Sequence, residues 1–273
     1  MEAYFDNSAT TPVYPEVRDL VVKLMEQDYG NPSSLHQKGV DAARYVSDAR
    51  DKIARLLKVQ AKEIVFTSGG TESNNMALIG GALANRRAGN KIITTAVEHA
   101  SVGSPLTFLE DMGFDVVRIP TGSDGVVDVD RLVDEVDDDT IIVSVMYVNN
   151  EIGAVMPVED IARRIKEKNP SVLFHVDAIQ AFGKYVIYPK RMGIDMMSIS
   201  SHKFHGHLPR STVHKGQSQG QACDIRWRPA GRNAVRNREC TGNSRNGTGC
   251  RDDLQRSRCK CSAHERTQGT SYR

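Results

Sequence analysis

The chain carries reactive side chains at points where predicted strands end. Lys203 follows an apolar segment in "SISSHKFHG", and a lysine beside a desolvating sheet edge can have a lowered pKa and form a Schiff base with an aldehyde. A solvated lysine is the simpler interpretation of this motif by itself. Asp177 ends the apolar segment "LFHVDA", where burial of an unpaired carboxylate would be costly. A cation on a ligand would supply the partner that this carboxylate needs.

A glycine-containing segment, "FTSGGTESNN" at 66–75, lies between a predicted strand and a predicted helix. Its glycines let the backbone approach a ligand, and free amides at a helix N-terminus, with the hydroxyls of Ser68 and Thr71, suit a phosphate. An ordinary glycine turn with a threonine N-cap explains the same residues. The segment therefore favours a phosphate site only if other polar residues converge on it.

Two further groups of polar residues follow predicted strands. Glu98 and His99 come after "KIITTAV", and a lone histidine there is more often structural than catalytic. Asn149 and Asn150 come after "TIIVSVMYV", as either turn formers or amide donors to a ligand. Together, a lysine, a buried acid, a histidine and a phosphate loop are the groups that pyridoxal 5'-phosphate requires for its aldehyde, pyridine nitrogen, ring and phosphate.

The elements that must position these residues alternate between two hydrophobic periods. Predicted strands cover 63–68, 91–97, 115–120, 140–148, 172–178 and 194–200. Predicted amphipathic helices cover 45–58, 74–89, 101–113, 128–138 and 157–168. Strands that are apolar on both faces and alternate with helices predict an α/β fold with a mainly parallel sheet covered by helices. Ligands of such sheets bind beyond the carboxyl ends of the strands, where these polar residues lie.

The composition divides the chain into an acidic front and a basic tail. Residues 207–273 hold 14 Lys+Arg against 5 Asp+Glu, which leaves 22 against 29 in residues 1–206. The tail also contains the only tryptophan and few aliphatic residues. We therefore expect one large domain over 1–206 and a disordered tail over 207–273, because so few apolar side chains cannot offset the entropy of ordering.

The chain resembles the cysteine desulfurases, which are fold-type I pyridoxal phosphate enzymes grouped with the class V aminotransferases. The resemblance covers residues 3–206 and rests on motifs in order: "YFDNSATTPVYPEV", "YGNPSSLHQKG", "FTSGGTESNN", "VEHASV", "VNNEIGAVMPVEDI", "FHVDAIQAFGK" and "SISSHKFHG". Any one of these motifs is weak evidence, whereas so many in one order are strong. The resemblance implies the large domain of the fold-type I transferases, here incomplete, with the small C-terminal domain missing.

Carried over motif by motif, the resemblance implies a role for each polar residue. Lys203 would hold the cofactor covalently, and His99 would stack on its ring as the catalytic base. Asp177 would pair with the pyridine nitrogen, and Gln180 with the phenolic oxygen. Asn150 would lie against the cofactor and the substrate carboxylate. The residues implied at the cofactor phosphate are Gly70, Thr71, Ser200 and His202.

The same resemblance implies an activity and partners. Family members convert L-cysteine to L-alanine and pass the sulfur, as a persulfide on a mobile-loop cysteine, to iron–sulfur cluster assembly or tRNA thiolation. Intact members are homodimers that deliver sulfur to an acceptor or scaffold protein. The alternatives are a selenocysteine lyase or an aminotransferase of the same fold, and a non-catalytic cofactor-binding remnant. The motifs "VEHASV" and "VNNEIG" favour the desulfurases among them.

The tail departs from the family, because residues 207–273 contain neither its "GGGQE" and "RSGTEN" segments nor its catalytic cysteine segment. A back-translation of the tail, read one base further on, restores a "YIR" strand and both segments. Trp227 followed by Arg228 forces a glycine in the shifted frame whatever codons are chosen. We hypothesise that the tail is an out-of-frame translation that begins between codons 206 and 213. The 273-residue chain should then show little sulfur transfer.

Other classes of partner fit the sequence less well. The cysteines lack paired C-x2-C spacing, so we expect no metal site from them. They are Cys223, Cys240, Cys250, Cys259 and Cys261. The basic tail would attract nucleic acid only nonspecifically, since it contains no recognisable module. The N-terminus shows no signal-peptide pattern and no apolar run reaches membrane-spanning length, so we expect a soluble, cytoplasmic chain without a membrane partner.

Overall fold

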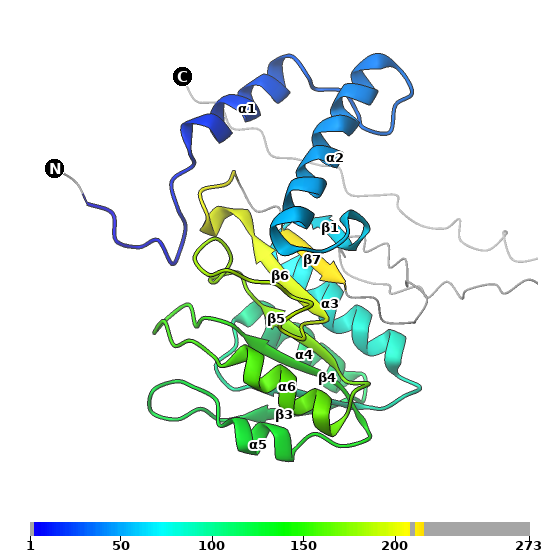
Figure 1. Cartoon of the computed structure of the whole chain (residues 1–273), viewed down its shortest axis with the longest axis vertical. Coiled ribbons are helices and arrows are strands. Elements are labelled where there is room, and N and C mark those ends of the chain that lie inside the picture. Colours follow the sequence, from blue (N-terminus) through cyan, green and yellow to red (C-terminus); the bar gives the residue numbers. More distant parts are fainter. Residues whose placement is uncertain (1–2, 208–210, 216–273) are drawn as a thin grey trace, which may run out of the picture. The chain divides into compact units, whose positions relative to one another are not determined.

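The computed structural model describes residues 3–207 and 211–215. The chain divides into two units, Met1–Arg226 and Trp227–Arg273, and all described residues belong to the first. A seven-stranded sheet runs through this first unit in the order β1-β7-β6-β5-β4-β2-β3 (Figure 1). Its strands are β1 (Ile64–Thr67), β2 (Lys91–Thr95), β3 (Asp115–Ile119), β4 (Thr140–Met146), β5 (Leu173–Asp177), β6 (Met196–Ser200) and β7 (Ser211–Lys215).

The sheet is mainly parallel, as the sequence predicts. Strands β6, β5, β4, β2 and β3 are parallel neighbours, whereas β7 is antiparallel to both β1 and β6. The central strands β4, β5 and β6 are buried along their whole length. Because β1 and β6 both run against β7, the carboxyl end of β1 lies at the same sheet edge as the carboxyl ends of the parallel strands.

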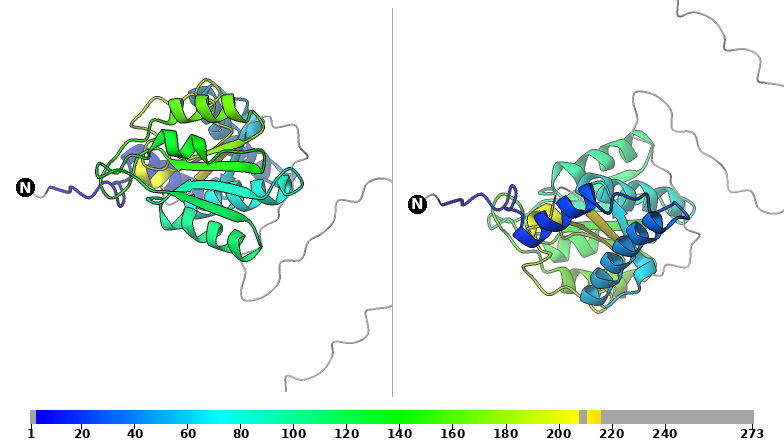
Figure 2. Two further views of the ribbon diagram at one scale, coloured as in Figure 1. Left: turned by 90° about the horizontal axis from the view of Figure 1, so that it is seen from below. Right: turned by 90° about the horizontal axis from the view of Figure 1, so that it is seen from above.

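Helices cover both faces of the sheet, and each face has its own hydrophobic core (Figure 2). The α-helices are α1 (Pro15–Glu26), α2 (Gln37–Leu57), α3 (Gly70–Asn85), α4 (Ala100–Asp111), α5 (Val129–Asp134) and α6 (Val158–Lys168). Leu57 of α2 and Ile161 of α6 share one core with Val143 of β4. Leu78 of α3 shares the other core with Ile142, the preceding residue of β4. Successive β4 side chains thus enter opposite cores, as the pleat requires.

The predicted elements are present, and the two largest differences lie near the N-terminus. All six predicted strands and all five predicted helices are confirmed. Helix α2 begins at Gln37, earlier than predicted, because the small residues Gly39 and Ala42 are buried and extend its inner face. Helix α1 was not predicted. It begins with Pro15 in its first turn, a favourable position for proline, and none of its residues is buried.

One expectation about the tail is wrong. Residues 211–215, predicted to be disordered, form β7, which pairs with β1 and β6 in the sheet. The physical reason is that ladder hydrogen bonds are made by the backbone, so a short "STVHK" segment with β-favouring Thr and Val can pair despite an unfamiliar sequence. The predictions about residues 216–273, including the five cysteines, lie outside the described residues. No helix in the described part of the chain is long and apolar enough to span a membrane.

Candidate active site

Polar residues gather at the edge where the parallel strands end. Asp177 is the last residue of β5, and His99 follows β2 as the N-cap of α4. Lys203 lies in η2 (Ser201–Lys203), the turn that follows β6, and Asn150 follows β4. Gly70 begins α3 just after β1. The sheet order therefore brings segments from five strand ends to one edge, as the sequence predicts.

A chain of hydrogen bonds joins Asp177 to His99. Asn74 of α3 donates its side-chain amide to Asp177 Oδ2 (2.8 Å) and to Ser101 Oγ (2.9 Å). Ser101 Oγ lies 2.7 Å from His99 Nδ1, which also accepts the Ser101 amide at 3.0 Å. Asn74 and Ser101 are buried, so these bonds are shielded from water. The two residues that the sequence singled out are thus linked through two that it did not.

Asp177 is a buried carboxyl group with neutral hydrogen-bond donors. Burial raises its pKa, and the hydrogen bonds from the Ile179 amide and from Asn74 oppose this shift. The positive charges of His99 and Lys203 also lower the pKa of Asp177. The net direction is upward, so neutral donors and these charges do not fully offset the burial. A cationic partner beside the carboxyl group would favour its ionised form.

Lys203 is half-buried and its amine contacts the N-terminal segment. The ammonium group donates to the carbonyl oxygens of Ser8 and of Ala9, the latter at 2.7 Å. Burial lowers the pKa of Lys203 first, and the charge of Lys184 lowers it further, while Asp6 and Asp177 act in the opposite direction. The neutral amine, which is the form that attacks an aldehyde, is therefore more populated at a given pH than in an ordinary lysine.

Three other predicted residues lie near Lys203. Gln180 donates its side-chain amide to the same Ser8 carbonyl at 2.9 Å. Ser200 Oγ and His202 Nδ1 are 2.8 Å apart, which joins the end of β6 to the lysine turn. Burial lowers the pKa of His202, and the charge of Lys203 adds to this effect. His202 therefore favours its neutral form beside a positive lysine.

The glycine segment after β1 opens α3 at its N-terminus. Gly69 is the N-cap and has no side-chain cap, and Glu72 in the first turn accepts the Ser68 amide. Thr71 is exposed and lies inside the first turn, so the interpretation of this threonine as the N-cap is wrong. The side chain cannot cap the helix from within it, and Thr71 stays available to a ligand at the helix N-terminus.

The two asparagines after β4 differ in their contacts. Asn149 is buried and organises the turn, because its Oδ1 accepts the amides of Glu151 (2.9 Å) and Ile152 (3.0 Å). Its amide also donates to the Val97 carbonyl at 3.0 Å. Asn150 donates to Glu151 Oε1, and no hydrogen bond within the described residues links Asn150 to the Asp177 chain. Asn149 is thus a turn former, while Asn150 remains the candidate for contact with a ligand.

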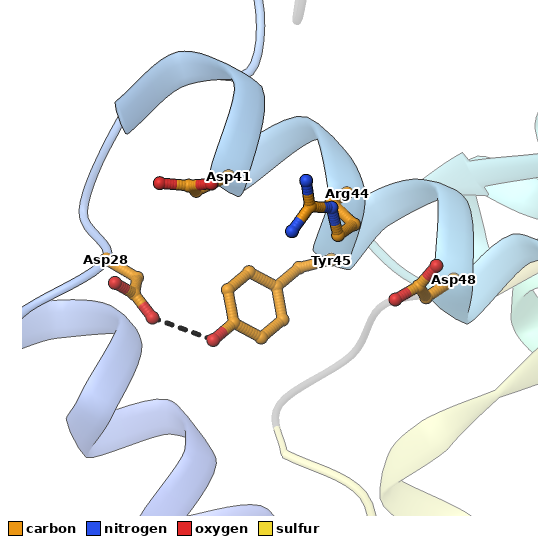
Figure 3. A pocket seen from close by; sticks show the side chains of 5 residues that line it. All are labelled: Asp28, Asp41, Arg44, Tyr45 and Asp48. Carbon is orange, nitrogen blue, oxygen red and sulfur yellow. Dashed lines mark hydrogen bonds between the residues drawn. The ribbon is translucent and has the colours of Figure 1, made fainter. Parts of the chain in front are cut away.

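A separate hollow lies beside α2 (Figure 3). It is lined by Asp28, Asp41, Arg44, Tyr45 and Asp48. Tyr45 donates to Asp28 Oδ2 at 2.7 Å, and Lys23 of α1 donates to Tyr45 Oη at 3.0 Å. These contacts join α1 to α2, and no predicted site residue lines the hollow. We interpret it as a structural feature.

Comparison with known protein families shows which family the chain belongs to. The family model for "Aminotransferase class-V" matches residues 3–208. The chain belongs to this family. Pyridoxal phosphate is the cofactor of the family, and the sequence-based prediction of this cofactor is confirmed at that level.

Several curated relatives are named cysteine desulfurases, and the relatives are longer than the matched region. Cysteine desulfurase IscS of Dictyoglomus turgidum is 42% identical over 205 residues, which make up 75% of this chain and 52% of that protein. The NifS/IcsS protein homolog of Lactobacillus delbrueckii subsp. bulgaricus is 47% identical over 206 residues, or 74% of this chain and 53% of that protein. The chain thus spans about half the length of these curated relatives.

Solved structures agree with the sequence matches. A structure titled "NIFS-LIKE PROTEIN" has a TM-score of 0.78 at 40% identity, and the match covers 81% of this chain and 60% of that chain. "SspA in complex with cysteine" has a TM-score of 0.72 at 34% identity, with 78% and 61% covered. The predicted resemblance and the predicted fold class are therefore confirmed.

The residues present fit the family cofactor. Asp177 is a buried carboxyl group with a raised pKa, which a pyridinium nitrogen would lower. Asn74 Oδ1 is buried without a hydrogen-bond partner among the described residues, so it is an acceptor that a bound group could use. Lys203, with its lowered pKa, suits the aldehyde. The N-terminus of α3, a helix of 16 residues, suits the phosphate.

Proposed function

We propose that residues 3–215 form a pyridoxal phosphate-binding domain of the cysteine desulfurase type. The observation that supports this best is the arrangement of Lys203, Asp177 and His99 at one sheet edge, with Asp177 buried and joined to His99 through Asn74 and Ser101. The desulfurase names of the relatives support L-cysteine as the substrate. Delivery of sulfur to an iron–sulfur scaffold or a thiolation pathway belongs to the same proposal.

Each residue acts on the cofactor or moves a proton. Lys203 Nζ, in its neutral form, would hold the cofactor aldehyde. Asp177 would hold the pyridine nitrogen in its protonated form, and the cofactor would supply an electron sink when bound. His99 would act as the base stacked on the ring, and its contacts with the Ser101 amide and hydroxyl hold the imidazole in place.

The remaining residues position the cofactor and substrate. Gly70 and Thr71 hold the phosphate from the N-terminus of α3, and Ser200 with His202 holds it from the end of β6. Gln180 would donate to the phenolic oxygen of the ring. Asn150 would lie against the cofactor and bind the substrate carboxylate. These roles follow from the motif positions and from the side chains available at this edge.

Cofactor titration with matched lysine variants tests the proposal. Pyridoxal phosphate added to the purified chain should give a visible absorbance band at a longer wavelength than the band of the free cofactor. Lys203→Ala should abolish this band. Lys184→Ala should retain it, since Lys184 contacts Gln180 at 3.4 Å and affects Lys203 only through charge. A band that persists in Lys203→Ala, or that never forms in the unsubstituted chain, would contradict the proposal.

We further propose that the 273-residue chain itself transfers little sulfur. The reason is that residues 207–273 resemble neither the family segment with the persulfide cysteine nor "RSGTEN". The assay measures alanine and sulfide released from L-cysteine, and family-like rates from the purified chain would show this proposal to be wrong. The nucleotide sequence across codons 206–213 tests the proposed frame change separately.

We also propose that the chain forms a homodimer, as the family resemblance implies. A homodimer should have about twice the monomer mass in equilibrium ultracentrifugation, and a species of monomer mass would contradict the proposal for this chain.

A further inference from the structure

The N-terminal segment is bound along the turn that contains Lys203. In both views of Figure 2 the segment before α1 (blue) passes beside the segment that follows β6 (yellow). Thr11 is 7% exposed, and it is the one buried residue between residues 3 and 38. A single buried side chain in an otherwise exposed segment identifies where that segment is anchored.

Thr11 makes three hydrogen bonds to the two sides of Lys203. Its amide donates to the His202 carbonyl at 3.0 Å, and its hydroxyl donates to the same carbonyl at 2.9 Å. The hydroxyl also accepts the His205 amide at 2.7 Å. The Thr11 hydroxyl therefore acts as donor before the lysine and as acceptor after it, which uses both of its hydrogen-bonding capacities.

The backbone at His205 has an unfavourable conformation that needs support from its neighbours. His205 has a φ of 63°, in the left-handed region that residues with a side chain seldom adopt. Its Nδ1 donates to the Pro12 carbonyl at 2.9 Å, and its carbonyl accepts the Tyr14 amide at 3.2 Å. The Tyr14 ring stacks on the His205 imidazole, with 4.3 Å between the ring centroids. All these partners belong to the N-terminal segment, so the segment stabilises the strained turn.

The same segment supplies the contacts of the lysine amine. Lys203 Nζ donates to the carbonyls of Ser8 and Ala9, and the Gln180 amide donates to the Ser8 carbonyl. Ser8 and Ala9 lie three and two residues before Thr11, so anchoring at Thr11 sets where these carbonyls lie. A shift of the segment would change the surroundings of the reactive amine.

We propose that Thr11 is a positioning residue for Lys203. Its hydroxyl fixes the backbone on both sides of the lysine and, through the N-terminal segment, the polar groups around the lysine amine. This inference rests on the proposed binding of pyridoxal phosphate to Lys203, but the anchoring itself does not.

Three variants separate the role of the hydroxyl from general packing. Thr11→Val keeps the shape and removes the hydroxyl, whereas Thr11→Ser keeps the hydroxyl. Thr10→Val is the matched control, because Thr10 is the exposed neighbour on the same segment. The first measurement is amide hydrogen exchange of peptides covering 8–14 and 202–206 in the cofactor-free chain. The second is the fraction of Lys203 trapped by borohydride at increasing pyridoxal phosphate concentration, read by peptide mass spectrometry.

Thr11→Val should raise exchange at 8–14 and 202–206 by about tenfold, the effect of losing one or two net hydrogen bonds. The pyridoxal phosphate concentration that half-saturates Lys203 should rise by roughly three- to tenfold, on the same reasoning. Thr11→Ser and Thr10→Val should stay close to the unsubstituted chain. Unchanged exchange at 202–206 in Thr11→Val, or increased exchange throughout β4 and β5 as well, would overturn the proposal.

The two measurements distinguish the two proposals. If the unsubstituted chain traps no pyridoxal phosphate at Lys203, the proposed function fails, and the exchange experiment alone decides whether Thr11 anchors the turn. If trapping occurs but the half-saturating concentration is equal in Thr11→Val and Thr11→Ser, the positioning role fails while cofactor binding stands.

Discussion

Glu98 is a second buried carboxyl group beside Asp177. Its Oε1 accepts the Thr95 hydroxyl at 2.6 Å and the Met146 amide at 2.8 Å, which joins the ends of β2 and β4. Its Oε2 is buried without a hydrogen-bond partner among the described residues. Burial raises the pKa of Glu98 to about 8, and the charge of Asp177 contributes in the same direction. Near neutral pH Glu98 is therefore mainly protonated, so it adds little negative charge beside Asp177.

The Glu98→Gln variant should reduce the fall in stability between about pH 4.5 and pH 8. Because the pKa of Glu98 is higher in the folded than in the unfolded chain, its contribution is fully present below about pH 4.5 and is lost as pH rises through about 8. Glutamine keeps an oxygen for Thr95 and Met146 but does not ionise. The variant should match the unsubstituted chain near pH 5 and exceed it near pH 9, by at most roughly 4 kcal/mol. Thermal melts across this range give the comparison, and parallel profiles would contradict it.

His175 should control the acid limb. It is fully buried on β5, with Ser144 Oγ 2.9 Å from Nδ1 and Ser198 Oγ 3.2 Å from Nε2. Burial lowers the pKa of His175 to about 3. The unfolded chain then binds a proton that the folded chain does not, so stability falls as pH decreases from about 6.5 towards 3.

The His175→Gln variant removes this proton uptake while keeping a donor and an acceptor between the two serines. Its unfolding free energy should therefore fall less steeply, by up to roughly 1.4 kcal/mol per pH unit within that range. Denaturant titrations at pH 7 and pH 4 measure the slope. As a control, His36→Gln makes the same substitution at an exposed histidine.

At the residue scale, sequence predicts reactive groups better than their supports. Lys203, Asp177 and His99 could be predicted to lie together because each follows a predicted strand of a parallel sheet, and their positions at the strand ends are confirmed. Asn74 and Thr11 could not, since their importance comes from bonds to residues 103 and 191 positions away. Asn and Thr are common in helices and turns, so their type alone carries no signal. Asn74 does lie within the quoted "GGTESNN" motif, which was its only hint.

At the scale of elements, hydrophobic periodicity was sufficient where both faces are buried. Strands β4, β5 and β6 are apolar runs whose burial is complete, and these were predicted nearly to their ends. Helix α1 was missed because none of its residues is buried, so its apolar residues do not mark a face that packs on the sheet. Strand β7 was missed because the prediction relied on side chains, whereas its pairing is made by the backbone.

Backbone pairing of β7 gives an element-scale prediction. Val213 lies opposite Val65 of β1 and Ser198 of β6, in the interior of the sheet. Val213→Pro removes a ladder amide there and should destabilise the chain by roughly 2–4 kcal/mol. Val213→Thr keeps the amide and a β-branched side chain, so it should cost much less. Urea denaturation compares the two, and equal stabilities would mean that β7 does not pair in solution.

At the scale of the whole molecule, the sheet order limits where the folded unit can end. Among the described strands β7 is last in sequence, but it lies between β1 and β6, so it joins the glycine segment after β1 to the lysine turn after β6. The predicted domain boundary at 206 would place this joining strand outside the domain. The composition change that suggested the boundary reflects side chains, and the sheet extends past it.

Two truncations test the boundary directly. A chain ending at residue 218 keeps β7 and should melt within about 2 °C of the full chain, because the remaining tail has too few apolar residues to add a core. A chain ending at residue 206 should lose far more stability, since removing β7 leaves the backbone groups of both β1 and β6 without their partner. It should also trap less pyridoxal phosphate at Lys203, because the two cofactor-binding segments would no longer share a strand. Equal melting temperatures for the two truncations would place the end of the folded unit at residue 206 after all.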